Sequence, residues 1–190
     1  RDTQRLRRVG VDRGERRVTL VSDARPELMI GYHKPTLPTF EDYVFDLIDG
    51  LLTAGRTSRL YRRLVEEKQV AVSVSTVNGY PGGRYANLFT ITATPRAPHT
   101  AAAVEAEIDA ELALLAVEPA APGELSRVKN QLRAGLIRGL QSNEGLALTL
   151  AYYETLAGDW RYLTTHLARL ETITPADIQA VAAKYLRKEN

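Results

Sequence analysis

The order of hydrophobic and polar residues predicts two β-strands near the start of the chain. Residues 27–34 form one of them, and the nearly continuous apolar run at 28–30 favours a central position in a sheet. Residues 17–22 form the other. Between them, residues 23–26 contain the aspartate and proline that are typical of a turn. We therefore expect the sheet to begin before the first helix.

The clearest helix is predicted at 39–54, where apolar residues recur every three or four positions and form one stripe. Gly55 is suited to end it. Residues 57–69 again have apolar side chains at helical spacing, now among arginines, and the hydroxyl of Thr57 or Ser58 is placed to cap the first turn. A basic helix therefore leads directly into the next strand.

A period of two replaces the helical period after residue 69. Valines at 70, 72 and 74 alternate with alanine and serine, which predicts a half-buried strand. The glycines and proline at 79–84 predict a hairpin loop, and residues 85–94 alternate in the same way, with threonines on the face that we expect to be solvated. The two strands are predicted to pair antiparallel.

From residue 98 onward the pattern is helical almost throughout. Helices are predicted at 100–117, 124–141 and 142–156, then at about 160–170 and from 174 to near the end. Pro122, Gly158 and the Thr-Pro-Ala-Asp sequence at 174–177 supply start and stop signals. Strands that come mostly before the helices predict an α+β domain, with a mostly antiparallel sheet and helices packed on one face.

Composition indicates an ordinary globular domain. The chain has 190 residues, of which 44 % are hydrophobic and 25 % charged, and its formal net charge of +2 gives no reason to expect a polyanionic partner. The absence of cysteine excludes disulfides and thiolate chemistry. No apolar run approaches the roughly 18 residues that a membrane span needs.

We expect one domain at 16–190, preceded by a basic linker or arm at 1–15. The chain starts with arginine, and we expect it to be the second half of a longer polypeptide. The arm has an alternative role in binding nucleic acid or acidic lipid, with an affinity that falls steeply with salt. A solvated linker is favoured, because the arm lacks the aromatic residues that stack on bases. No nucleic-acid partner is therefore expected.

No catalytic or metal-binding motif is present. His33, His99 and His166 belong to different predicted elements, and no spacing such as H-x-x-E-H brings two of them to one helix face. Glu66 and Glu67 are candidates for general acid and base, although the solvated end of a helix is the favoured interpretation. A Ser–His–Asp site stays open, because such a triad is recognised by geometry and not by sequence order.

Two tyrosines are candidates for lining a groove. Tyr152 and Tyr153 lie on a predicted helix with Asn143 near its start. Packing in the core with one hydroxyl at the surface is the default interpretation for such residues. The glycine-rich loop at 79–83 resembles neither a phosphate-binding loop nor a dinucleotide turn.

One stretch of the chain resembles a known family. Residues 55–61 read Gly-Arg-Thr-Ser-Arg-Leu-Tyr, and Glu-Glu-Lys at 66–68 is followed directly by a strand. These motifs resemble the second-half domain of the pitrilysin and insulin-degrading group of zinc peptidases, which includes the mitochondrial processing peptidases. The resemblance extends from about 16 to 186 and includes the Ser-Asn-Glu, Ala-Tyr-Tyr-Glu and Gly-Asp-Trp sequences that begin at 142, 151 and 158.

The resemblance implies a metallopeptidase-repeat domain without zinc ligands. In that group another domain carries H-x-x-E-H and holds zinc, so zinc is expected in the N-terminal domain of the parent protein and no cofactor in this chain. A second domain often carries an arginine and a tyrosine that hold the substrate backbone. By resemblance these positions are Val65 and Val72, and valine donates no hydrogen bond to an oxyanion. Catalytic and metal-binding residues are therefore expected to be absent here, and the substrate-binding residues stay unknown.

Two functions follow from the resemblance. The first is a non-catalytic domain of a zinc endopeptidase that encloses peptide substrate over a zinc domain elsewhere in the parent chain. The alternative is an inactive scaffold or assembly subunit, which the core subunits of a respiratory complex resemble. The expected partners are the N-terminal zinc domain, a peptide, and a homodimer or a partner subunit that supplies the arginine and tyrosine. Bacterial periplasm and cytoplasm are both compatible with the sequence, and the isolated chain is expected to be inactive toward peptides.

Overall fold

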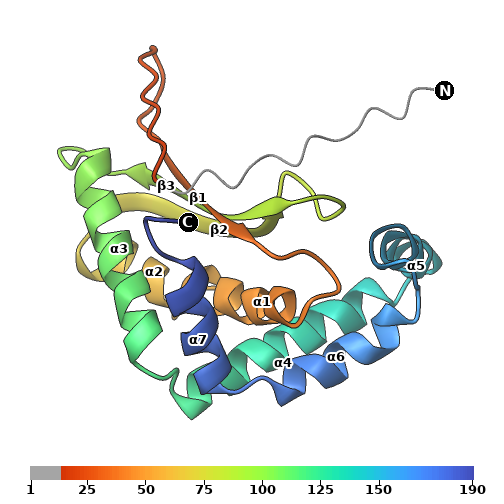
Figure 1. Ribbon diagram of the computed structural model, residues 1–190. Coiled ribbons are helices and arrows are strands. Elements are labelled where there is room, and N and C mark those ends of the chain that lie inside the picture. The colour runs from red at the N-terminus through yellow and green to blue at the C-terminus, as the bar shows by residue number, and fades with distance from the viewer. Residues whose placement is uncertain (1–13) are drawn as a thin grey trace.

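The computed structural model describes residues 14–190, and within this range the chain forms a three-stranded antiparallel sheet with helices on one side of it (Figure 1). The strands are β1 (Leu28–Lys34), β2 (Ala71–Tyr80) and β3 (Asn87–Pro95). Their order is β1-β3-β2, so that β3 pairs with both neighbours. The antiparallel pairing of β2 with β3 confirms the predicted hairpin, and the architecture confirms the α+β class.

The predicted central position of the 27–34 strand is wrong, because β1 lies at an edge of the sheet. Its apolar run is not buried on both faces, since Met29 is 56 % exposed. The strand predicted at 17–22 is also wrong. No strand partner pairs with this segment in the described chain, and Val18, Leu20 and Val21 are exposed. The segment is instead tied to a helix through Arg17, whose Nη1 donates to Glu105 at 2.8 Å.

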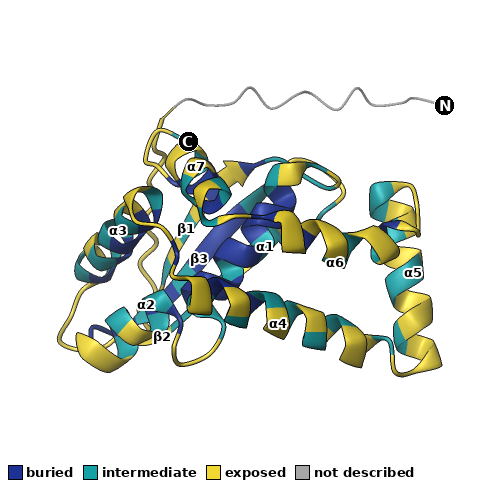
Figure 2. Cartoon of the chain, turned by 90° about the horizontal axis from the view of Figure 1, so that it is seen from below, coloured by how far each residue is buried: buried dark blue, intermediate teal, exposed yellow. Residues whose placement is uncertain are grey.

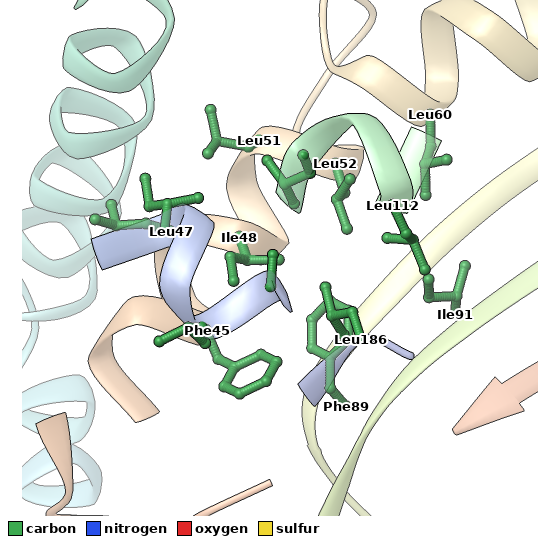
Figure 3. Packing of buried hydrophobic residues seen from close by; sticks show 14 of the residues in the cluster. Phe45, Leu47, Ile48, Leu51, Leu52, Leu60, Phe89, Ile91, Leu112 and Leu186 are labelled. Atoms are coloured by element: carbon green, nitrogen blue, oxygen red, sulfur yellow. The ribbon is translucent and has the colours of Figure 1, made fainter. Parts of the chain in front are cut away.

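Helix α1 (Phe40–Thr53) is the centre of the core. It contacts the sheet through β2 and also packs against α4, α6 and α7. Phe45 of α1 meets Phe89 of β3 with 5.3 Å between ring centroids, and both point into the cluster shown in Figure 3. The helix is therefore buried on most sides and not only along the predicted stripe. Its side chains with no exposed surface are Tyr43, Val44, Phe45, Leu47, Ile48, Leu51 and Leu52.

The arginine-rich stretch after Gly55 differs from the single α-helix predicted over 57–69. It contains one short turn, α2 (Arg59–Tyr61), followed by a π-helix, η1 (Arg62–Glu67). Ser58 occupies the N-cap position, but its hydroxyl donates to the carbonyl of Gly55 at 2.6 Å and does not cap the turn. The chain then passes through Gln69, at φ 52°, into β2. A single π-helical turn lengthens the backbone hydrogen-bond step by only one residue, from i+4 to i+5, so hydrophobic spacing over six residues seldom reveals it.

The predicted helices of the second half are confirmed. They are α3 (Ala101–Val117), α4 (Pro122–Gly139), α5 (Asn143–Ala157), α6 (Tyr162–Thr172) and α7 (Pro175–Tyr185). Thr174 and Asp177 form the predicted capping box, and Gly158 ends α5 in the left-handed region at φ 72°. Within the described residues, no helix combines the length and the apolar character that crossing a membrane requires.

The helices differ in how closely they cover the sheet. Helices α1, α3 and α7 lie directly beneath it, whereas α4 and α6 extend to one side and α5 crosses their far ends (Figures 1 and 2). No residue of α5 is fully buried. We call α4, α5 and α6 the helical arm. Because its helices are packed on one side only, the arm leaves side chains exposed next to the core.

Candidate functional site

The two positions singled out by the family resemblance lie on either side of the junction between η1 and β2. Val65 is partly buried and packs against the hydrophobic core. Val72 lies at a bulge between Ala71 and Ser73, where the β2–β3 register shifts, and is 55 % exposed. Neither side chain has a hydrogen-bond donor. The role of these positions in substrate binding stays a prediction.

The arginines of this stretch have a structural role that sequence analysis missed. Arg59 binds Glu124 of α4 through two hydrogen bonds of 2.9 Å each, from Nε and Nη2. Arg63 donates to Glu107 at 2.9 Å and to Glu111 at 3.3 Å, both on α3. The network joins α2 and η1 to two other helices. The sequence feature that could have predicted this network is the spacing of four residues between Arg59 and Arg63 and between Glu107 and Glu111. This spacing places each pair on one helix face.

The predicted acidic and histidine candidates do not assemble into a catalytic or zinc site. Glu66 and Glu67 form surface ion pairs with Arg56 and Arg62 at 3.4 and 3.2 Å, which is the solvated helix end that we favoured. No group of three or more acidic or histidine side chains in residues 14–190 is arranged to hold a metal ion. Of the three histidines, His166 alone is placed in the site described next.

A cleft of about 380 Å³ lies where the helical arm meets α1 and the β2–β3 hairpin. Asp42 and Asp46 are four residues apart on α1, as are Tyr162 and His166 on α6, so each pair points the same way. Asn78 comes from the end of β2. We call this the acidic–aromatic cleft and define it by Asp42, Asp46, Asn78, Tyr152, Tyr153, Tyr162 and His166.

The two carboxylates of the cleft have different environments. Asp42 accepts a hydrogen bond from the ammonium group of Lys34, a side chain with no exposed surface, so its charge is balanced within the fold. Asp46 Oδ1 accepts from Asn78 Nδ2 at 2.8 Å, while its Oδ2 lies 3.8 Å from His166 Nε2, which is too far for a hydrogen bond. Asp46 therefore has one oxygen without a hydrogen-bond donor among the described residues.

Burial changes the protonation of Asp46 and His166. It raises the pKa of Asp46 to about 7, with a further contribution from the charge of Asp42. Burial also lowers the pKa of His166 to about 4. Near neutral pH the imidazole is therefore uncharged, and the Asp46 carboxyl is divided between its ionised and its protonated form. The cleft changes charge in the physiological range through Asp46 and not through the histidine.

Aromatic rings form the other wall of the cleft. Tyr153 contacts Tyr162 with 4.9 Å between ring centroids, and Tyr162 stacks on Tyr43 at 5.3 Å. Tyr152 meets Tyr153 edge to face at 5.5 Å and is 51 % exposed. Tyr152 and Tyr153 line the cleft, which was the alternative to the default of core packing, and Tyr153 also packs against the core. Asn143 is not part of the cleft lining.

Sequence analysis missed Asp42, Asp46, Asn78 and Tyr162 as members of one site, and it considered His166 only as a zinc ligand. The residues come from α1, β2, α5 and α6, so that only the packing of the arm brings them together. The spacing of four residues within α1 and α6 was the available signal. Chemically, the cleft offers acceptors and aromatic faces, and no side chain in it is paired as an activated nucleophile.

The fold and the site define a class: an α+β domain without a metal centre in its described residues, joined to an arm of partly exposed helices. A match to the protein family described as the peptidase M16 inactive domain covers residues 3–132, and the chain belongs to this family. The match confirms the predicted relationship to the non-zinc domains of pitrilysin-type and processing-peptidase-type proteins. No curated protein matches the chain.

Solved structures share the fold at low sequence identity. A protease from Helicobacter pylori superimposes with a TM-score of 0.86 at 24 % identity, covering 94 % of this chain and 43 % of that one. The inactive peptidase domain of a proposed zinc protease from Bordetella parapertussis has a TM-score of 0.75 at 24 % identity and covers 91 % of both chains. A chain of complex III from Candida albicans has a TM-score of 0.70 at 14 % identity, covering 84 % of this chain and 39 % of that one. This chain thus spans less than half of the Helicobacter protease.

Proposed function

We propose that this chain is the non-catalytic domain of a zinc endopeptidase and helps to enclose a peptide over a zinc domain located elsewhere in the parent protein. Membership of a family of inactive peptidase domains is the observation that carries the proposal. The Helicobacter protease supports it, since the likeness to this chain accounts for 43 % of its length and leaves the remainder for other domains.

Zinc has to be held by the other part of such a protein. The described residues of this chain do not fit a zinc site, because no group of three candidate ligands is found among them. The contribution of this domain is then to position and confine the peptide. The N-terminal zinc domain of the same polypeptide is the first partner that the proposal requires.

An inactive scaffold or assembly subunit is the second candidate. Val65 and Val72 favour it, because neither can supply the hydrogen bonds that the resemblance assigns to these positions. The likeness to a chain of complex III from Candida albicans supports it, because this fold also occurs in that assembly. A partner subunit or a second copy that supplies an arginine and a tyrosine would reconcile the valines with peptidase activity.

The test compares peptide cleavage by the full-length parent, by the parent lacking this domain, and by this chain alone, each with and without a zinc chelator. We expect chelator-sensitive cleavage by the parent only, and we expect the shortened parent to retain its zinc when analysed by elemental mass spectrometry. Cleavage by this chain alone that survives the chelator would overturn the proposal. A parent that cleaves nothing even with added Zn²⁺, but is recovered in a stable complex, would instead establish the scaffold.

A further inference from the structure

The acidic–aromatic cleft contains several polar atoms that have no partner. Asn78 uses its amide nitrogen on two acceptors, Asp46 Oδ1 and the carbonyl of Asp42, which fixes the orientation of the amide. Its Oδ1 is then left without a donor, as are the Tyr162 hydroxyl and His166 Nδ1 within the described chain. Tyr162 is only 8 % exposed. Buried polar atoms usually have a hydrogen-bond partner in native proteins, so these three mark the cleft as a candidate place for a polar ligand or water.

The acidic side chains of the cleft also lack positively charged neighbours in its lining. None of the described residues that line it is lysine or arginine. Two cations contact residues of the cleft lining. Lys34 binds Asp42, and Arg127 donates through Nη1 to Gln131 and to the carbonyl of Ala54, while its buried Nη2 has no hydrogen-bond partner among the described residues. Asp46 therefore faces the cleft without a cation of its own, and its side chain is 26 % exposed.

The aromatic wall suits a flat cation. Tyrosine faces attract cations, and a guanidinium stacks on them while its N–H groups point outward in the plane. A guanidinium already lies over one of the neighbouring rings, since Arg169 is 5.4 Å from the Tyr43 ring centroid. Tyr43 in turn stacks on Tyr162, which lines the cleft.

We infer that the acidic–aromatic cleft binds a guanidinium cation, carried either by an arginine side chain of a peptide or by a free small molecule. Asp46 supplies the countercharge and, through Oδ2, an acceptor for N–H groups, and Tyr152 and Tyr153 supply aromatic faces. A volume of about 380 Å³ is at the lower end of the range for small-molecule sites. The inference rests on this chain's own residues and does not depend on whether the parent is a peptidase.

Binding is expected to depend on pH through Asp46. The charged and titratable groups that face it are Asp42 and Asp49 on α1, Lys34 on β1, His166 on α6 and the tyrosines on α5 and α6. His166 is neutral at pH 6 and above, because burial lowers its pKa to about 4. The ionised fraction of Asp46, with its pKa near 7, then sets the fraction of competent sites, so affinity should be about tenfold lower at pH 6 than at pH 8.

The test titrates the 190-residue chain by calorimetry with the amidated tripeptide acetyl-Ala-Arg-Ala at constant ionic strength. The matched control ligand replaces arginine with citrulline, which has the same shape without the charge, and a second control replaces it with lysine. We expect saturable binding of the arginine peptide, with at least a tenfold loss for citrulline and a smaller loss for lysine. Equal affinity for citrulline, or no saturable binding of any arginine compound, would overturn the inference. Equal affinity for lysine would overturn the assignment to guanidinium.

Two variants locate the binding. Asp46→Asn removes the charge but keeps the acceptor for Asn78, and it should weaken binding at least tenfold. Tyr152→Leu removes an aromatic face at a half-exposed position where folding is not at risk, and it should weaken binding several-fold. Asp23→Asn, at an exposed position outside the cleft, is the control and should bind as tightly as the unsubstituted 190-residue chain. Unchanged affinity in both cleft variants would place the binding elsewhere and refute the inference.

The source of the cation is decided by comparing the arginine peptide with agmatine. Tighter binding of the peptide identifies the ligand as an arginine side chain, and tighter binding of agmatine identifies it as a free small molecule. The imidazole NMR signals of His166 supply an independent readout. They should shift on binding and saturate with the calorimetric isotherm, whereas those of His33 and His99, which do not line the cleft, should not move.

Discussion

Replacing Asp46 with asparagine should stabilise the fold at alkaline pH, and the reason is the cost of ionising this carboxyl in the cleft. Its pKa is 3.8 in the unfolded reference and about 7 in the folded chain. Because the folded value is the higher one, the folded state binds the extra proton between these two pH values. The contribution of Asp46 to the stability of the chain therefore falls as pH rises from about 4 to 7. Asparagine does not ionise and escapes this loss.

The magnitude follows from proton linkage. With those two pKa values, the contribution of Asp46 to the free energy of unfolding drops by about 2 to 3 kcal/mol between pH 5 and pH 8. Between pH 5 and pH 8, the free energy of unfolding of the Asp46→Asn variant should therefore rise by this amount relative to that of the unsubstituted chain. The hydrogen bond from Asn78 is retained in the variant, because the side-chain oxygen of asparagine also accepts.

The assay is urea denaturation of both proteins at pH 5 and pH 8, followed by circular dichroism. Urea is used because guanidinium salts would occupy the proposed site. Asp23→Asn is the matched control, and its stability relative to the parent should not change with pH. A gap that is the same at both pH values would refute the raised pKa. A variant that is less stable than the parent at pH 8 would show that the ionised carboxylate is held by favourable contacts that the structure does not contain.

The remaining predictions concern the scaffold of the cleft. Gly50→Ala should destabilise the chain by about 1 to 3 kcal/mol in urea denaturation, because its Cβ would lie 2.4 Å from the buried Val128 Cγ1, and adding Val128→Ala should recover part of the loss. Arg59→Ala should cost about 2 kcal/mol, since it leaves Glu124 without its two-bond partner, and a double-mutant cycle with Glu124→Gln should show the coupling. Thr174→Ala should lower the free energy of unfolding by about 1 kcal/mol through loss of the capping box, and thermal denaturation would measure the loss as a lower Tm.

The helices of the second half could be predicted because their signals are local. Thr174 with Asp177 and Gly158 in the left-handed region each satisfy backbone groups within one turn of the chain, so no knowledge of distant residues is needed. The antiparallel pairing of β2 and β3 was predictable for the same reason, since a glycine-rich loop joins them directly.

The two errors about strands concern residues whose state depends on distant partners. The apolar run of β1 indicated a central strand, yet the sheet closes with β3 in the middle and leaves Met29 exposed. Residues 17–22 have the alternation of a strand but find no neighbour to pair with in the described chain. Their alternation is a local property, whereas strand formation requires backbone partners from elsewhere.

The candidate site was less predictable than the fold, because its chemistry is assembled from four elements. Tyr152 and Tyr153 could be proposed from their position on an exposed helix, but Asp46 looked like any polar residue on the outer side of an amphipathic helix. Its significance comes from α6, which places His166 3.8 Å away, and from β2, which places Asn78 at 2.8 Å. Sequence motifs were sufficient to predict the class of protein, whereas the cleft could be recognised only from the packing of the helices and strands.

One of the two family-related positions, Val72, lies at the opposite end of β2 from the cleft. Val72 is near the start of β2 and Asn78 near its end, six residues later, which corresponds to roughly 20 Å along an extended strand. A substitution at one end of the strand therefore makes no direct contact with the residues at the other end. The valines at 65 and 72 offer no hydrogen-bond donor at the junction between η1 and β2, and the acceptors of the cleft are separate from them. Valines at these two positions are thus compatible with cation binding by the cleft, and binding by the cleft and catalysis by a full-length protein have to be measured separately.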